Sequence, residues 1–232
     1  MKKKLLKIHC WLAIPFGIII SILSFTGALI LFRKELRPVI EFLFGEDNTF
    51  MRTVMRLHGS LMIPRGDGIS VGSMLIGASA IAMSIIIITG IALWWPHNKE
   101  MLKRHLSVHL NKGFRRFVYD SHISLGIYSA AFLLLMSLTG PAWSFKWYNE
   151  GATATLSLFT HHDNETARQG HRAFTPEDKA LVTLHTGSWC GYTVKVLYLL
   201  AAITGGFLPV SGYYMWIMRK RNKRPNHLKH IS

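Results

Sequence analysis

Four long apolar stretches dominate this sequence and limit what it can fold into. They cover about residues 8–32, 69–96, 121–145 and 192–218, and Lys195 is the single Asp, Glu, Lys or Arg among them. Each stretch is long enough to cross the hydrocarbon core of a bilayer as a helix, which takes about 20 residues. One buried helix of a soluble protein could look like this, but four leave little chain for a soluble core. We therefore predict an all-α membrane protein, with residues 1–232 forming a single domain of four transmembrane helices.

The charged residues lie between these stretches and are unevenly distributed. The net charge is +15, and the bases concentrate in residues 2–7, in a loop at 97–120 and in a tail at 219–232. Acidic residues nearly cancel the bases in the segments 33–68 and 146–184. The positive-inside rule then puts both termini, the loop and the tail in the cytoplasm, and leaves 33–68 and 146–184 as short periplasmic segments. Anionic lipid headgroups account for these charges, so we expect a multi-pass protein of the bacterial inner membrane that binds no nucleic acid.

The N-terminal apolar stretch is expected to remain in the protein. Its apolar run of about 25 residues exceeds the 7–15 of a signal-peptide core, and no small-residue cleavage site follows it. We interpret it as the first transmembrane helix.

An internal repeat relates the first and third stretches. Thr26-Gly27 follows His9 at the same spacing at which Thr139-Gly140 follows His122. Matched motifs at matched spacing indicate a duplicated structural unit.

The second and fourth stretches share a different pattern. His58 precedes a long apolar stretch that ends near Thr89-Gly90, and His185 precedes one that ends near Ser211-Gly212. The chain is therefore predicted to be a duplicated two-helix unit, in which each span has a histidine at or just before its start.

The predicted topology sorts these four histidines into two pairs. His9 and His122 would lie at the cytoplasmic face, and His58 and His185 at the outer face. Because equivalent positions of a duplicated structure tend to face each other across its pseudo-two-fold axis, we expect one facing pair near each membrane surface. A single histidine at a membrane edge is commonly an interfacial residue, but four at repeated positions favour a functional role.

Paired imidazoles in a membrane bundle indicate haem. A low-spin haem iron takes one axial donor on each side of the ring, so His9 with His122 and His58 with His185 would each hold one b-type haem, two per chain, as axial iron ligands. Zinc would require four ligands close together, and the sequence has no C-x-x-C-H motif for covalent haem attachment. Glycines near these histidines are expected to admit a flat macrocycle: Gly17, Gly59, Gly126 and Gly187.

The remaining histidines are expected to play lesser roles. His97, His105 and His109 lie in the basic loop, where a solvated or headgroup-facing side chain is the default. The run 161–163, His-His-Asp, is a weaker candidate for contact with a metal-bearing substrate. The Trp residues near the helix ends fit an aromatic belt at the membrane interfaces, although Trp143 and Trp147 are also placed to line a haem edge.

Several segments together resemble the PepSY-associated transmembrane family, which includes bacterial ferric-siderophore reductases. They include 6–12 (LKIHCWL), 57–61 (LHGSL), 89–96 (TGIALWWP), 116–128 (RFVYDSHISLGIY) and 184–187 (LHTG), and they touch all four spans. The resemblance implies a dihaem membrane protein that passes electrons from a cytoplasmic-side donor to ferric iron outside. The family often has Arg directly after the first and third histidines, where this chain has Cys10 and Ile123.

The resulting hypothesis is a ferric-chelate reductase that transfers electrons through two bis-histidine haems to ferric iron or a ferric siderophore in the periplasm. The periplasmic segments are too short for a typical PepSY region, so substrate recognition would be minimal or supplied by a periplasmic partner protein. The alternative is a non-enzymatic haem-binding or partner-binding subunit of an iron-uptake or assembly complex. A proton-coupled transporter fits less well, because the spans lack acidic residues.

Overall fold

The computed structural model describes residues 2–45, 49–64, 70–158 and 176–222, and all of its regular elements are helices. Four of them are long and apolar enough to cross a membrane, which confirms the predicted fold class. The elements are α1 (Lys2–Leu31), α2 (Arg33–Phe44), α3 (Thr49–Ser60), α4 (Val71–Trp94), α5 (Lys99–Leu106), η1 (Leu110–Lys112), α6 (Phe114–Thr139), η2 (Gly140–Trp143), α7 (Lys146–Ser157), α8 (Pro176–Thr186) and α9 (Gly191–Asn222).

The long helices do not coincide with the apolar stretches. Helix α1 begins at Lys2, and α9 continues to Asn222, because basic side chains at the membrane surface do not interrupt a helix. Helix α4 is shorter than its stretch. Ser70 caps its start by accepting a hydrogen bond from the Ser73 amide, and it ends before Trp95, whose extended ψ of 113° suits the residue that precedes Pro96.

The four long helices form a square bundle. Helix α1 packs against α4 and α9, and α6 packs against the same two helices. Within the described residues, α1 and α6 share no comparable contact, so they lie on one diagonal of the square, with α4 and α9 on the other. Helices α1, α3 and α4 form one half, and helices α6, α8 and α9 form the other, and the two halves meet along α1–α9 and α4–α6.

Small and hydroxyl-bearing residues hold the two halves together. Ser84 of α4 donates a hydrogen bond to Ser137 of α6 (2.9 Å), and Ser21 of α1 donates one to the Gly206 carbonyl of α9 (3.0 Å). A Cβ atom on Gly206 would come within 2.6 Å of the Phe25 ring. Because lipid is as apolar as the helix surfaces, close backbone approach and such hydrogen bonds are the means by which membrane helices associate.

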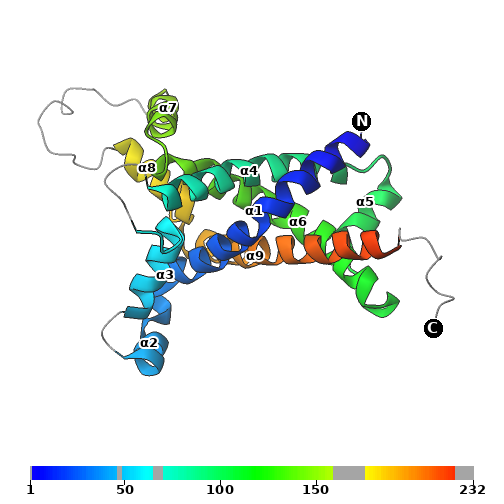
Figure 1. Ribbon diagram of the computed structural model, residues 1–232, viewed down its shortest axis with the longest axis horizontal. Coiled ribbons are helices and arrows are strands. Elements are labelled where there is room, and N and C mark those ends of the chain that lie inside the picture. The colour runs from blue at the N-terminus through cyan, green and yellow to red at the C-terminus, as the bar shows by residue number, and fades with distance from the viewer. Residues whose placement is uncertain (1, 46–48, 65–69, 159–175, 223–232) are drawn as a thin grey trace, which may run out of the picture.

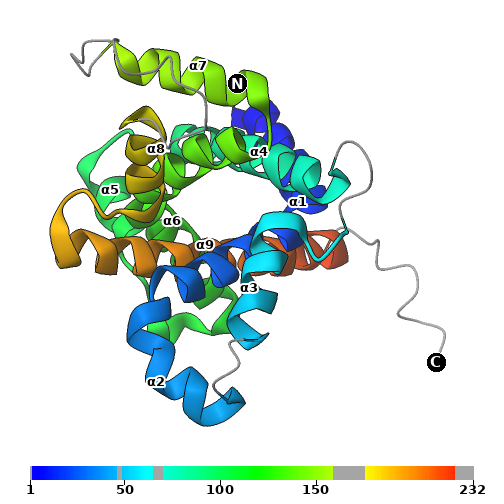
Figure 2. The same ribbon diagram turned by 90° about the vertical axis from the view of Figure 1, so that its left-hand side faces the viewer.

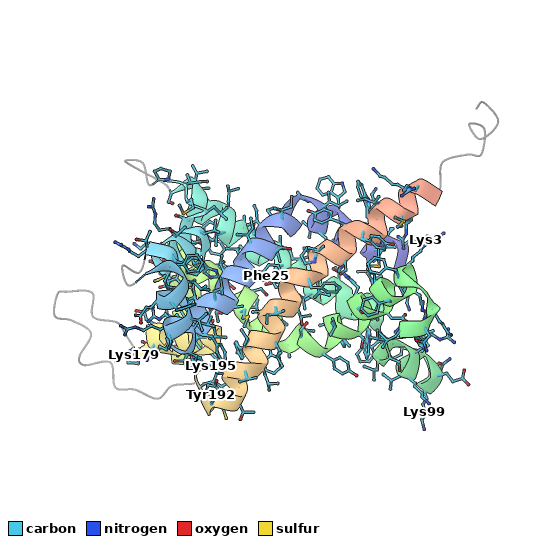
Figure 3. All side chains as sticks on the ribbon, turned by 90° about the horizontal axis from the view of Figure 1, so that it is seen from below. Lys3, Phe25, Lys99, Lys179, Tyr192 and Lys195 are labelled. Carbon is cyan, nitrogen blue, oxygen red and sulfur yellow. The ribbon has the colours of Figure 1, made fainter. Side chains whose placement is uncertain are left out.

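The bundle has two distinct ends. The start of α1, the end of α9 and the α5 loop lie together at one end, which we call the basic end (Figure 1). Helices α2, α3, α7 and α8 lie at the opposite end, which we call the α3/α8 end. Figure 3 shows Lys3 and Lys99 at the basic end and Lys179 and Lys195 at the α3/α8 end.

The segments between the spans at the α3/α8 end are folded into short helices. Viewed along the bundle, α2, α3, α7 and α8 surround that end (Figure 2). Helix α3 packs against α1 and α4, and α8 packs against α6. A salt bridge between Lys195 and Glu35 (2.5 Å) ties the start of α9 to α2. The short helices thus place His58 and His185 beside the ends of α1 and α6.

Candidate functional site: four histidines in two pairs

The histidines of the first half each contact a Thr-Gly pair on another helix. His9 of α1 lies against α4, where its Nδ1 is 3.2 Å from Thr89 Oγ1 and 3.0 Å from the Ile86 carbonyl oxygen. His58 of α3 lies against α1, where its Nδ1 is 2.9 Å from Thr26 Oγ1. The two long helices of this half therefore each fix one imidazole.

The second half repeats the arrangement. His122 of α6 lies against α9, with Nδ1 2.8 Å from Ser211 Oγ. His185 of α8 lies against α6, with Nδ1 2.9 Å from Thr139 Oγ1. The same four roles thus occur in both halves, with Ser211 in place of a threonine.

The hydrogen bonds of each imidazole fix its tautomer. Thr26 Oγ1 donates to the Ile22 carbonyl (2.7 Å), and Ser211 Oγ donates to the Leu208 carbonyl (2.8 Å). Thr89 and Thr139 donate to carbonyls one turn earlier in the same way. Each imidazole also has a backbone carbonyl as a hydrogen-bond partner, and a carbonyl can only accept: Ile86 for His9, Leu23 for His58, Leu208 for His122 and Met136 for His185. The proton is therefore on Nδ1, and Nε2 keeps the lone pair that binds a metal.

The glycine of each pair makes room for the histidine ring. A Cβ atom on Gly27 would lie 3.2 Å from His58 Cε1, and one on Gly90 would lie 3.4 Å from His9 Cε1. At Gly140 and Gly212 the corresponding distances are 3.8 and 3.7 Å, which are ordinary contacts. The fit is tighter in the first half than in the second.

The second ring nitrogen of each histidine is left free. Nε2 has no hydrogen-bond partner among the described residues. It is not sealed in either, because Trp94 Nε1 is the only buried side-chain nitrogen or oxygen in the described part of the chain that lacks a partner. Each Nε2 is therefore not fully covered and has no competing hydrogen bond among the described residues, as an axial metal ligand requires.

The four histidines lie in two pairs, each formed by one histidine from each half. His122 and His9 are near enough to interact electrostatically, and so are His185 and His58. The first pair lies on α1 and α6, the diagonal helices, and the second on α3 and α8. In each pair, one imidazole comes from each half of the chain.

Burial keeps the pair at the α3/α8 end uncharged. It lowers the pKa of His185 to about 4, an effect to which the charge of nearby His58 adds. Burial also lowers the pKa of His58 from its ordinary value. Because both pKa values lie below the usual 6.5, the rings are neutral at neutral pH and can ligate a metal without first losing a proton.

One tryptophan contacts a paired histidine, and a second lies on the helix face that contacts another. The Trp143 ring meets the His185 ring edge to face, with centroids 5.1 Å apart. Trp94 lies one helical turn after Gly90, on the same face of α4, and its buried Nε1 is the unpaired donor noted above. A buried donor without an acceptor is costly in a protein, so Trp94 marks a place where a bound group with an acceptor would fit.

Comparison with known protein families gave a match. Residues 39–219 match the family described as the PepSY-associated TM region. The chain belongs to this family. The matched range includes His58, His122 and His185, whereas His9 lies before it. No curated protein and no solved structure gave a match.

Some expectations about neighbouring residues were wrong. Gly17 packs against Tyr213, and Gly187 packs against Tyr198, so neither leaves room beside a histidine. His105 and His109 are not simply solvated, because Nδ1 of His105 is 2.9 Å from the Trp94 carbonyl oxygen and His109 is bonded to Asp120. The run 161–163, His171, His227 and His230 lie outside the described residues.

The role of the Thr-Gly and Ser-Gly pairs was missed by sequence reasoning. Their repeated spacing revealed the duplication, but nothing in it indicated that each pair would hold a histidine of another helix. One signal in the sequence could have indicated this role. Each of the four repeated histidines is matched by one repeated pair of a hydroxyl residue and a glycine.

Proposed function

We propose that this protein conducts electrons across the membrane through two b-type haems and reduces ferric iron or a ferric siderophore on the far side. The observation that carries the proposal is the state of the four imidazoles. Each has Nδ1 beside a hydroxyl and Nε2 without a hydrogen-bond partner among the described residues, and they come in pairs from opposite halves. An iron with one axial donor on each side needs this donor set.

The chain's own residues would act as ligands and as positioning groups. His9 with His122 would hold the haem at the basic end, and His58 with His185 the haem at the α3/α8 end. When bound, haem supplies reversible one-electron transfer at its iron. The Thr and Ser hydroxyls orient the imidazoles and increase their basicity, as partners of metal-bound histidine do in other proteins.

Haem suits these residues better than a bare metal ion does. Within the described residues, no three His, Cys, Asp or Glu side chains gather so as to hold a metal ion. A zinc site would need such a group, whereas haem brings four nitrogen donors of its own and asks the protein for two. Trp94 Nε1 would offer an unpaired hydrogen-bond donor to a carboxylate of the haem at the basic end.

The charge distribution supports a direction for the electrons. The basic end would face the cytoplasm, by the positive-inside rule. An electron from a cytoplasmic-side donor would then enter near His9 and His122 and leave near His58 and His185, where ferric iron gains one electron to become ferrous. The proposal assigns the protein to the bacterial inner membrane, because the asymmetry of its basic residues follows the positive-inside rule.

One observation favours the alternative, a haem-binding or partner-binding subunit without reductase activity. Helix α2 lies outside the spans, yet its Phe42 is 87% exposed and its Leu43 62%. Exposed apolar side chains beyond the spans suit binding to a partner protein or to the membrane surface.

Absorption spectroscopy of the detergent-purified protein tests the proposal. We expect reduced b-type bands and two haems per chain by pyridine haemochrome assay, with the dithionite-reduced protein reoxidised on mixing with a ferric chelate. A correctly folded but colourless protein would contradict haem binding. If the reduced haem is not reoxidised by a ferric chelate, the result would instead support the function as a subunit.

A further inference from the structure

The loop at the basic end has a defined fold of its own. Asn98 caps α5 by accepting a hydrogen bond from the Met101 amide (2.8 Å). Ser124 Oγ of α6 donates to the Leu106 carbonyl (3.0 Å), and His105 joins the end of α5 to the Trp94 carbonyl. These bonds hold the loop against α4 and α6, so the side chains it presents are positioned rather than free.

A buried carboxylate fixes two of these side chains. Asp120 of α6 is 3% exposed. It accepts hydrogen bonds from His109 Nδ1 (2.8 Å) and from Arg116 Nε (3.0 Å). Because Asp120 holds them from the inside, both side chains line the same surface hollow.

This hollow, which we call the α5–α6 hollow, has a volume of about 460 Å³. Arg104 and Arg116 also line a smaller adjoining space of about 140 Å³, which is bordered by Ile123, the residue after His122. The charged or titratable side chains around the larger hollow are Glu100, Lys103, Arg104, His109, Lys112 and Arg116.

The positive charge of the hollow is largely uncompensated. Arg116 is paired with Asp120, but Lys103, Arg104 and Lys112 form no ion pair with any residue that the structure describes. Glu100 is the single carboxylate of the lining. Cations converging on one concave surface attract an anion jointly, and Lys and Arg are the side chains that bind phosphate oxygens.

We propose that the α5–α6 hollow is a binding site for a phosphate-bearing anion. The phosphate can belong to a soluble nucleotide or to the headgroup of an anionic lipid, since the recognising chemistry is the same. The smaller adjoining space reaches Ile123 of α6, the residue after His122, which would suit a nucleotide-type electron donor, an interpretation that rests on the proposed function. The binding site itself does not depend on haem.

Calorimetric titration of the full chain, purified in an uncharged detergent, tests this proposal. The soluble probes are pyrophosphate and flavin mononucleotide, in low salt. The variant K103Q/R104Q/K112Q removes the three unpaired cations, which are all exposed, so its fold should persist. The matched control K2Q/K3Q/K4Q removes the same charge from exposed residues at the same end of the bundle.

We expect the wild-type protein and the control to bind at least one soluble probe, more weakly as salt is raised. The hollow variant should bind about tenfold more weakly or worse, as expected when several charge-assisted hydrogen bonds are lost. Native mass spectrometry from phosphatidylglycerol nanodiscs provides the lipid arm. If neither soluble probe binds, retention of phosphatidylglycerol that the hollow variant loses and the control keeps would identify a headgroup site.

Two results would overturn the proposal. One is that neither soluble probe nor phosphatidylglycerol binds the wild-type protein. The other is that the hollow variant binds them as tightly as the control does, with both variants eluting as folded protein in gel filtration. Either result can occur with both haems in place, so failure of this site is distinguishable from failure of the proposed electron transfer.

Discussion

Each of the four histidines has its Nδ1 beside a hydroxyl that also lies within hydrogen-bond distance of a carbonyl of its own helix. The effect is to set the tautomer without using any charged group. In a low-dielectric environment a carboxylate partner would bring a large desolvation cost. A threonine or serine that satisfies its helix carbonyl and accepts from imidazole avoids that cost, which explains why polar residues recur in apolar spans.

Replacing Thr26 tests this role. Thr26→Val keeps the side-chain volume but removes the acceptor of His58 Nδ1. We expect haem affinity at the α3/α8 end to fall by about 10–100-fold, the usual effect of losing a partner of a metal ligand. Thr26→Ser retains the hydroxyl and should bind as the wild-type protein does. Haem transfer to apomyoglobin measures the difference, and equal transfer rates for the Val and Ser variants would contradict the role.

A glycine comparison tests how closely the ring is held. In Gly27→Ala the new methyl would lie 3.2 Å from His58 Cε1, so the ring must shift by a few tenths of an ångström. In Gly212→Ala the distance to His122 Cε1 is 3.7 Å, which needs no shift. We expect the first variant to change the spectrum or midpoint potential of one haem and the second to leave both unchanged. The opposite ranking would show that ring contact is not what the glycine provides.

At the scale of elements, the short helices α3 and α8 carry the histidines of one pair. Helix α3 ends where the chain turns sharply, with Leu61 and Met62 in the left-handed region at φ 52° and 62°. The start of α4 then passes so close that a Cβ on Gly72 would lie 2.0 Å from the Ser60 carbonyl oxygen. Gly72 therefore fixes the position of α3 relative to α4.

Gly72→Ala should displace α3 and with it His58. No side chain is available to yield, because the clash is with backbone. We expect the variant to lose haem from the α3/α8 end while His9 and His122 still bind theirs. Gly151→Ala in α7 meets nothing within 4 Å and serves as the control. Haem content per inserted chain is the measurement, and two haems per chain in the Gly72 variant would refute the argument.

At the scale of the whole molecule, neither half contains a complete histidine pair. Each half orients two imidazoles with its own hydroxyls, but each pair consists of one imidazole from the first half and one from the second. The interhelical bonds along α1–α9 and α4–α6 therefore decide whether the pairs form. The two pairs lie at opposite ends of the bundle, so they should act as separate sites.

Alanine substitution of the histidines tests that separation. His58→Ala or His185→Ala should remove one haem and leave the other, and His9→Ala or His122→Ala should remove the opposite one. Redox titration of each variant should show a single midpoint, and the two classes of variant should retain different midpoints. Loss of both haems from one substitution, in protein that still inserts, would contradict independent sites.

The sequence alone determined the spans, the duplication, the four histidines and the family. These were accessible because apolar length, repeat spacing and short motifs are local properties of the chain. The family match and the four spanning helices confirm the first and last of these. Haem binding, electron transfer and the orientation in the membrane stay predictions.

Only the tertiary structure decided which hydroxyl meets which histidine. Thr89 lies 80 residues after His9 in the sequence, yet the two side chains are in contact. Thr26 of α1 contacts His58 of α3 rather than a histidine of its own helix. Such contacts depend on how α1, α4, α6 and α9 are arranged around the square, and helical periodicity says nothing about that arrangement. The same is true of Asp120, whose burial between His109 and Arg116 shapes the basic loop. Spacing along the chain locates the four histidines, and packing between helices decides which hydroxyl each imidazole meets.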